Sequence, residues 1–77
     1  MAVTLKSTFG SFEVDAYSKA EIVQNPFSGE KVTLTGLEAA VYDYVKGAEI
    51  MGLYDEMNQG RDWFMTNNSK AYMALLD

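Results

Sequence analysis

The sequence predicts an α+β fold, in which short antiparallel strands of the N-terminal half form a small sheet and helices of the C-terminal half pack against it. Apolar and polar residues alternate from Phe12 to Ala16, a strong turn sequence follows at residues 25–30, and apolar residues recur at helical spacing after Thr35. A chain of 77 residues is short enough to form one domain, so we expect a single domain over residues 1–77.

The N-terminal half is expected to hold four strands. Phe12 and Val14 flank Glu13, and this alternation is typical of a strand with one buried face. Gly10-Ser11 is a turn sequence that would join the first two strands as a hairpin. The alternative is a partly ordered N-terminal arm, because chain termini fray unless they are paired. The expected strands cover about residues 2–8, 12–17, 20–24 and 31–34.

The clearest turn precedes the fourth strand. Pro26 fixes its φ angle and lacks an amide donor, and Gly29 can take the positive φ that a tight reversal needs. Val32 and Leu34 then share one face of the short strand that follows.

A capping box predicts the start of the first helix, which is expected over residues 36–51. The Thr35 hydroxyl can accept from the Glu38 amide while the Glu38 carboxylate reaches back. Gly47 interrupts the helix without changing its phase, and Gly52 is expected near its end. One apolar stripe along this helix is expected to face the core: Leu37, Ala40, Val41, Tyr44, Val45, Ala48 and Met51.

Two further helices are expected over residues 55–66 and 69–76. Asp55 and Glu56 suit the N-terminus of the first of these, where acidic groups are favourable. The sequence Asn67-Asn68-Ser69 breaks the helix, and either Asn68 or Ser69 can cap the last one. The residues expected to dock the last helix on the core are Tyr72, Met73, Leu75 and Leu76.

The amino-acid composition favours binding to another protein or self-association. A domain of this size buries a small core, and small domains usually gain stability from disulfides, a metal or a partner. The chain has no Cys and no His, which removes disulfides and the commonest metal ligands. Aromatic residues make up 13% of the chain, more than so small a core easily hides. We therefore expect a protein partner or a homo-oligomer.

The net charge of −5 makes nucleic acid an unlikely partner, because binding to its backbone needs a basic face. The same charge disfavours an anionic membrane surface. The first residues carry no basic segment leading into an apolar one, and no apolar run approaches membrane-spanning length. The protein is expected to be cytoplasmic.

Few residues could carry catalysis, so the protein is expected not to be an enzyme. Acid–base and nucleophilic chemistry most often recruits His or Cys, and both are missing. Asp55, Glu56 and Asp62 form the densest acidic group, which could hold Mg²⁺ or Ca²⁺ if a turn brought them together, but their spacing is not that of an EF-hand. We expect a solvated helix start there, with no catalytic residue, cofactor or metal site.

Aromatic side chains are the best candidates for a binding surface, because aromatic anchors supply much of the energy of many interfaces. Tyr42 lies off the apolar stripe of the first long helix, which makes it a candidate for an exposed contact. The full set of interaction candidates is Tyr42, Tyr54, Trp63, Phe64 and Tyr72.

Two stretches of the chain carry a resemblance to known proteins. The first is Asn25-Pro26-Phe27-Ser28-Gly29-Glu30 running into Leu34-Thr35 and Ala40-Val41-Tyr42-Asp43-Tyr44-Val45-Lys46-Gly47, and the second is Asp62-Trp63-Phe64-Met65 with Tyr72-Met73-Ala74-Leu75-Leu76-Asp77. Through these motifs, residues 25–77 resemble small uncharacterised proteins of tailed phages that infect marine cyanobacteria. The resemblance implies a source, a phage with the protein in host cytoplasm or virion, and it implies no activity or functional residue.

The function that the sequence favours is a non-enzymatic protein–protein interaction module, such as a phage accessory or structural protein. One alternative is a nucleic-acid-associated protein, which would need the scattered basic residues to converge, or an acidic mimic of DNA. The other alternative is a small hydrolase or metal enzyme, which would need carboxylates converging in a concave site.

Overall fold

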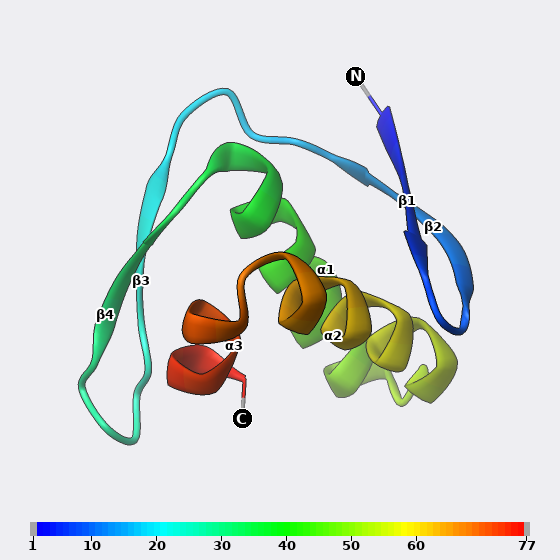
Figure 1. The fold of residues 1–77 in the computed structure, drawn as a ribbon. Coiled ribbons are helices and arrows are strands. Elements are labelled where there is room, and N and C mark those ends of the chain that lie inside the picture. Colours follow the sequence, from blue (N-terminus) through cyan, green and yellow to red (C-terminus); the bar gives the residue numbers. More distant parts are fainter. Residues whose placement is uncertain (1, 77) are drawn as a thin grey trace.

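Two β-hairpins and three helices make up the fold, and the α+β prediction is confirmed (Figure 1). The computed structural model describes residues 2–76. The strands form two separate two-stranded sheets rather than the one small sheet expected. In chain order the elements are β1 (Ala2–Ser7), β2 (Gly10–Asp15), β3 (Glu21–Gln24), β4 (Lys31–Leu34), α1 (Gly36–Met51), α2 (Tyr54–Asn67) and α3 (Ser69–Leu75).

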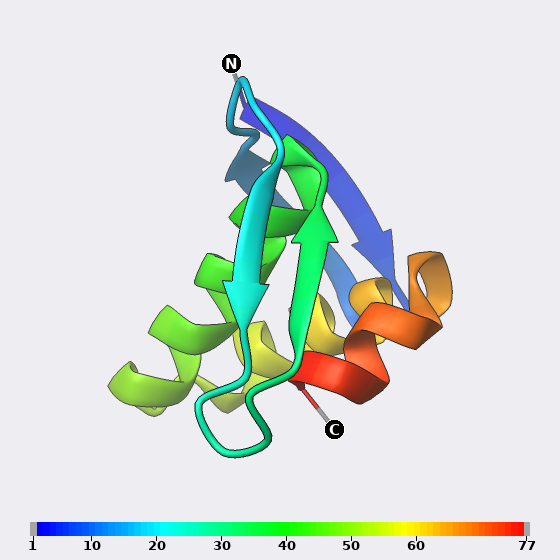
Figure 2. The same ribbon diagram turned by 90° about the vertical axis from the view of Figure 1, so that its left-hand side faces the viewer.

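The helices lie between the two hairpins (Figure 1). The β1–β2 hairpin contacts α1 and α2, whereas the β3–β4 hairpin contacts α1 and, through β4, also α3. Figure 2 shows the second hairpin in front of the helices, with its turn reaching beyond them. Each hairpin can therefore bury one face on helices without pairing with the other hairpin.

The first hairpin is tighter than the sequence predicted. Leu5 pairs with Phe12 and Ser7 pairs with Gly10, so the turn is at residues 8–9 and not at 10–11. The Ser7 hydroxyl explains this position, because it accepts from the Phe9 amide at 3.1 Å and donates to the Gly10 carbonyl at 3.1 Å. Residues 2–7 are paired along β1, so the alternative of a partly ordered arm is wrong for them.

The second hairpin turns at the predicted position. The Asn25 side-chain oxygen accepts from the amides of Phe27, at 2.8 Å, and Ser28, at 3.3 Å, which is an Asx turn. The Asn25 side-chain amide also donates to the Ala74 carbonyl of α3 at 2.9 Å. One side chain therefore both shapes the turn and ties the hairpin to α3.

The capping box of α1 is confirmed. Thr35 Oγ1 accepts from the Glu38 amide at 3.1 Å, and Glu38 Oε1 accepts from the Thr35 amide at 2.9 Å. The helix ends where Gly52 takes the left-handed conformation, with φ of 73°. Glu38 also reaches α3, because its Oε2 accepts from the Asn68 side chain at 3.0 Å. Asn68 Oδ1 in turn caps α3 by accepting from the Ala71 amide at 3.2 Å.

The core lies where the three helices meet the inner faces of the hairpins. Two methionines predicted to be buried are exposed instead. Met51 lies beyond Ala48, the last buried residue of α1, and Met73 lies off the face of α3 that buries Ala71, Ala74 and Leu75. The buried apolar residues are Leu5, Phe12, Val14, Leu34, Ala39, Ala40, Val41, Val45, Ala48, Trp63, Phe64, Ala71, Ala74 and Leu75.

Candidate protein-binding surface

Large apolar side chains are concentrated on the surface where α1 meets α2. Ile50 is 86% exposed, Met51 72%, Leu53 42% and Tyr54 66%. We call these four residues the apolar corner. They occupy four of five consecutive positions at the junction of the two helices, and Met51 and Leu53 line a common hollow there.

The reversal of the chain between α1 and α2 explains why these side chains are not buried. The Leu53 amide bonds the Ala48 carbonyl at 2.8 Å, which folds the chain back directly after the last turn of α1. Ala48 is the last buried residue of α1, and α2 begins at Tyr54. The C-terminal end of α1 extends away from the other helices, at the lower left of Figure 2.

A hollow of about 290 Å³ adjoins the apolar corner. Its apolar wall combines corner residues with Tyr44, Gly47 and Ala48 of α1. Gly47 has no side chain, and a methyl group built there would meet no atom within 4 Å. The hollow is therefore open at the one interior glycine of α1.

Two acidic residues, Asp43 and Glu56, are among those that line this hollow, and Asp55 is exposed next to Glu56 in the sequence. Burial, and then the Glu56 carboxylate, raise the pKa of Tyr44 above its usual value. Lys46 is the one basic residue between positions 32 and 60, and its ammonium lies 3.7 Å from Glu49. The surroundings of the hollow therefore carry net negative charge.

The structure brings only one of the five predicted interaction residues into the apolar corner, namely Tyr54. Trp63 and Phe64 are buried at 8% and 0% exposure, and their rings pack edge to face 6.2 Å apart. They stabilise the core and have no surface to offer a partner. Tyr42 is half-buried against the core, with Lys46 5.7 Å from its ring centre. It is therefore less accessible than its place off the apolar stripe suggested.

Tyr72, the remaining candidate, is half-buried and already hydrogen-bonded. Its hydroxyl accepts from Arg61 at 2.9 Å, and the guanidinium lies 5.8 Å from its ring centre. Both groups line a different hollow, of about 320 Å³, together with the exposed side chains of Phe9 and Met65. This second hollow is more polar than the one beside the apolar corner, because Asn58, Arg61 and Asp62 are among its lining residues.

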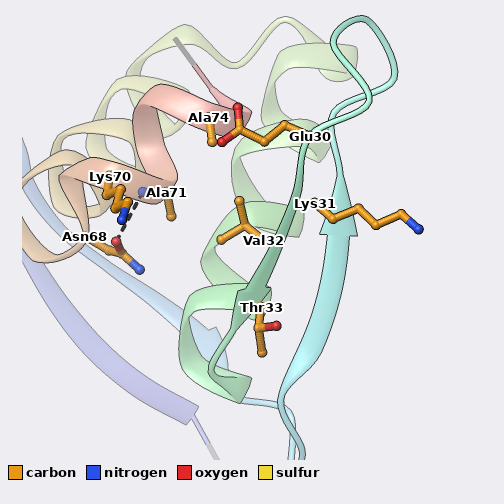
Figure 3. A pocket seen from close by; sticks show the side chains of 8 residues that line it. All are labelled: Glu30, Lys31, Val32, Thr33, Asn68, Lys70, Ala71 and Ala74. Carbon is orange, nitrogen blue, oxygen red and sulfur yellow. Dashed lines mark hydrogen bonds between the residues drawn. The ribbon is translucent and has the colours of Figure 1, made fainter.

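A groove of about 330 Å³ separates β4 from α3 (Figure 3). Val32 points across it toward α3, whereas Lys31 points away (Figure 3). Its far wall is made of small side chains, Ala71 and Ala74, with Lys70 beside them. Since no large exposed apolar side chain lines this groove, it is a weaker candidate for protein binding than the apolar corner.

The acidic group singled out in the sequence is not assembled into a metal site. Asp62 accepts from the Thr8 amide at 2.7 Å, and within residues 2–76 no three His, Cys, Asp or Glu side chains gather around a common point. No helix in the same span has the length and apolar character needed to cross a membrane.

No protein-family model, curated protein or solved structure matched the chain when it was compared with them. The resemblance of residues 25–77 to small phage proteins therefore stays a prediction. The site has to be interpreted from its own chemistry.

Proposed function

We propose that this protein is a non-enzymatic interaction module that binds another protein through the apolar corner. The observation that carries the proposal is the exposure of four large apolar side chains within five consecutive residues, beside an apolar hollow. Met51 and Leu53 belong both to the corner and to the lining of the hollow, and gathered exposed apolar side chains are a feature of protein-binding sites.

The energetics of the corner support binding. Fully burying one large apolar side chain is favourable by about 1.5–3 kcal/mol, and the corner offers four that are at least two-fifths exposed. Tyr54 belongs to a residue type that often dominates interface energies. A partner that covers the corner would gain this energy without any change to the core, because the corner side chains are not needed to fill it.

Site-specific photo-crosslinking tests the proposal. A photoreactive phenylalanine analogue is placed at Tyr54 and, as a matched control, at Met73, which is 67% exposed on α3. In cells of the source organism we expect position 54 to give an adduct of defined mass and position 73 to give none. Adducts from neither position, or the same adducts from both, would contradict the proposal. An adduct of twice the chain mass would identify the partner as a second copy.

A further inference from the structure

We infer that the partner of the apolar corner is a basic amphipathic segment of another protein, which places one large apolar side chain in the hollow at Gly47 and Lys or Arg side chains beside Asp43 and Glu56. This inference rests on the proposed function and specifies the chemistry of the partner. Three observations carry it: the unfilled position at Gly47, the size of the hollow and the charge around it.

Neither backbone conformation nor packing within the chain requires glycine at position 47. Glycine in a helix interior is unfavourable relative to alanine. No positive φ is found at Gly47, and no neighbouring element approaches the position where its Cβ would be. Gly60 shows the contrasting case, because a Cβ there would lie 2.5 Å from Val45 Cγ2. A small residue at position 47 does, however, keep the apolar hollow open to an incoming side chain.

The size and lining of the hollow suit a side chain. Its volume of about 290 Å³ lies at the lower limit of small-molecule sites, which span about 300–1,000 Å³. Tyr44, Ala48, Met51 and Leu53 supply an apolar wall, and Asp43 and Glu56 are the two charged residues of the lining. A single large apolar group can be buried there, as when an amphipathic helix docks in a groove.

The charge around the hollow selects a basic partner over a second copy. Asp43 and Glu56 are lining residues of the hollow, whereas the charge of Lys46 is offset by Glu49. A symmetric dimer through this surface would bring two acidic rims together, which is unfavourable. Lys or Arg side chains flanking an apolar anchor would instead complement the rim and speed association.

The test uses three synthetic peptides of about 18 residues, long enough to form a helix on binding. The first has leucine on one face and lysine on the other, the second replaces each lysine by glutamate, and the third replaces each leucine by serine. Binding is measured by fluorescence anisotropy and by NMR chemical shifts in about 0.15 M salt, where long-range charge effects are largely screened. We expect only the leucine–lysine peptide to bind, with shifts centred on residues 43–56.

Two pairs of variants locate the contact. Gly47→Leu fills the hollow and is expected to weaken binding about tenfold, whereas Thr66→Leu adds the same side chain to an exposed position of α2 and leaves binding unchanged. Glu56→Gln is expected to weaken binding about threefold, with Glu30→Gln as its control. Circular dichroism and thermal melting of each variant confirm that it is folded.

The outcomes separate this inference from the proposed function. Equal binding of the leucine–lysine and serine–lysine peptides would show nonspecific attraction between charges and would overturn the inference. Binding of the leucine–glutamate peptide would also overturn it. So would an affinity of Gly47→Leu for the leucine–lysine peptide equal to that of the parent protein. A crosslinked partner at position 54 would still support an interaction module in those cases. A dimer detected by light scattering and abolished by Gly47→Leu would replace the basic partner by a second copy.

Discussion

The carboxylate of Asp62 holds the turn of the first hairpin against α2. It accepts from the Thr8 amide at 2.7 Å and from the Thr8 hydroxyl at 3.3 Å, across 54 positions of sequence. Gln59, one helical turn earlier, donates to the Phe9 carbonyl at 3.4 Å. The turn is otherwise exposed, so these bonds are its main polar connection to the helices.

Asp62→Ala is expected to lower the free energy of unfolding by about 1–2 kcal/mol, because a hydrogen bond to a charged acceptor is lost from the turn. Hydrogen exchange should become faster along β1 and β2 and change little along β3 and β4. Thr66→Ala, which removes an exposed side chain near the other end of the same helix, is the control. Uniform acceleration in both hairpins would show that Asp62 has no local role.

The two interior helical glycines are expected to respond to alanine in opposite directions. Gly60→Ala should destabilise the protein by about 1–3 kcal/mol, because the added Cβ would come within 2.5 Å of Val45 Cγ2 and 3.1 Å of Tyr44 Cδ1. Gly47→Ala should stabilise it by about 0.5–1 kcal/mol, because alanine favours the helix and meets no neighbour. Urea unfolding of both variants measures the difference, and equal effects would refute the packing argument.

The capping box of α1 is expected to contribute measurably to stability. Thr35→Ala should cost about 1 kcal/mol by leaving the Glu38 amide without its acceptor. Glu38→Ala should cost more, since Glu38 also accepts from Asn68 at the start of α3. Thr33→Ala, on the exposed face of β4, serves as the control in thermal melts. If Glu38→Ala cost no more than Thr35→Ala, the bond to Asn68 would be without consequence.

Stability is expected to fall at alkaline pH in a way that depends on Tyr17. The Tyr17 hydroxyl donates to Asp43 Oδ2, and this bond is the main reason that the pKa of Tyr17 lies above its usual value. A raised folded-state pKa means that the folded protein holds the proton more tightly. The contribution is therefore complete below pH about 10 and is lost as pH rises further. Tyr42 and Tyr44 have pKa values raised chiefly by burial, so they add to the same decline.

The phenolate absorbance of Asp43→Asn tests this assignment. Removing the Asp43 charge should lower the pKa of Tyr17, which loses its charged hydrogen-bond acceptor, and to a smaller extent that of Tyr42, so two tyrosines should titrate at lower pH than in the parent protein. Asp55→Asn should leave the titration curve unchanged. A curve for Asp43→Asn that overlays the parent curve would show that the Tyr17 bond does not control the titration.

Features set by near neighbours in the chain could be predicted from sequence. The capping box at Thr35, the end of α1 at Gly52 and the turn at Asn25 all depend on hydrogen bonds over a few residues. The separation of the strands into two hairpins depends instead on which helix each one contacts, and periodicity carries no information about that choice. The turn of the first hairpin lies at residues 8–9 and not at Gly10-Ser11, because the Ser7 hydroxyl accepts from the Phe9 amide.

The candidate site was predictable only in part. Tyr54 was expected at a surface, but Met51 was expected in the core, because helical spacing tells which face a residue shares and not how far the neighbouring helix extends. One sequence feature could have predicted the exposure of Met51. The apolar stripe of the first helix runs to the residue directly before Gly52, where the chain is expected to reverse, so the end of the stripe lies beyond the part of the helix that its neighbours cover. Trp63 and Phe64 look like binding aromatics in the sequence and are buried because α2 turns them toward the hairpins and α1.

The apolar corner lies within five consecutive residues, whereas the core draws buried residues from every element except β3. Substitutions at its four positions can therefore accumulate without opening a cavity or breaking a capping bond. The corner and the core can therefore change independently during evolution. Proteins that share this fold need not bind the same partner, and such differences are expected first at residues 50–54.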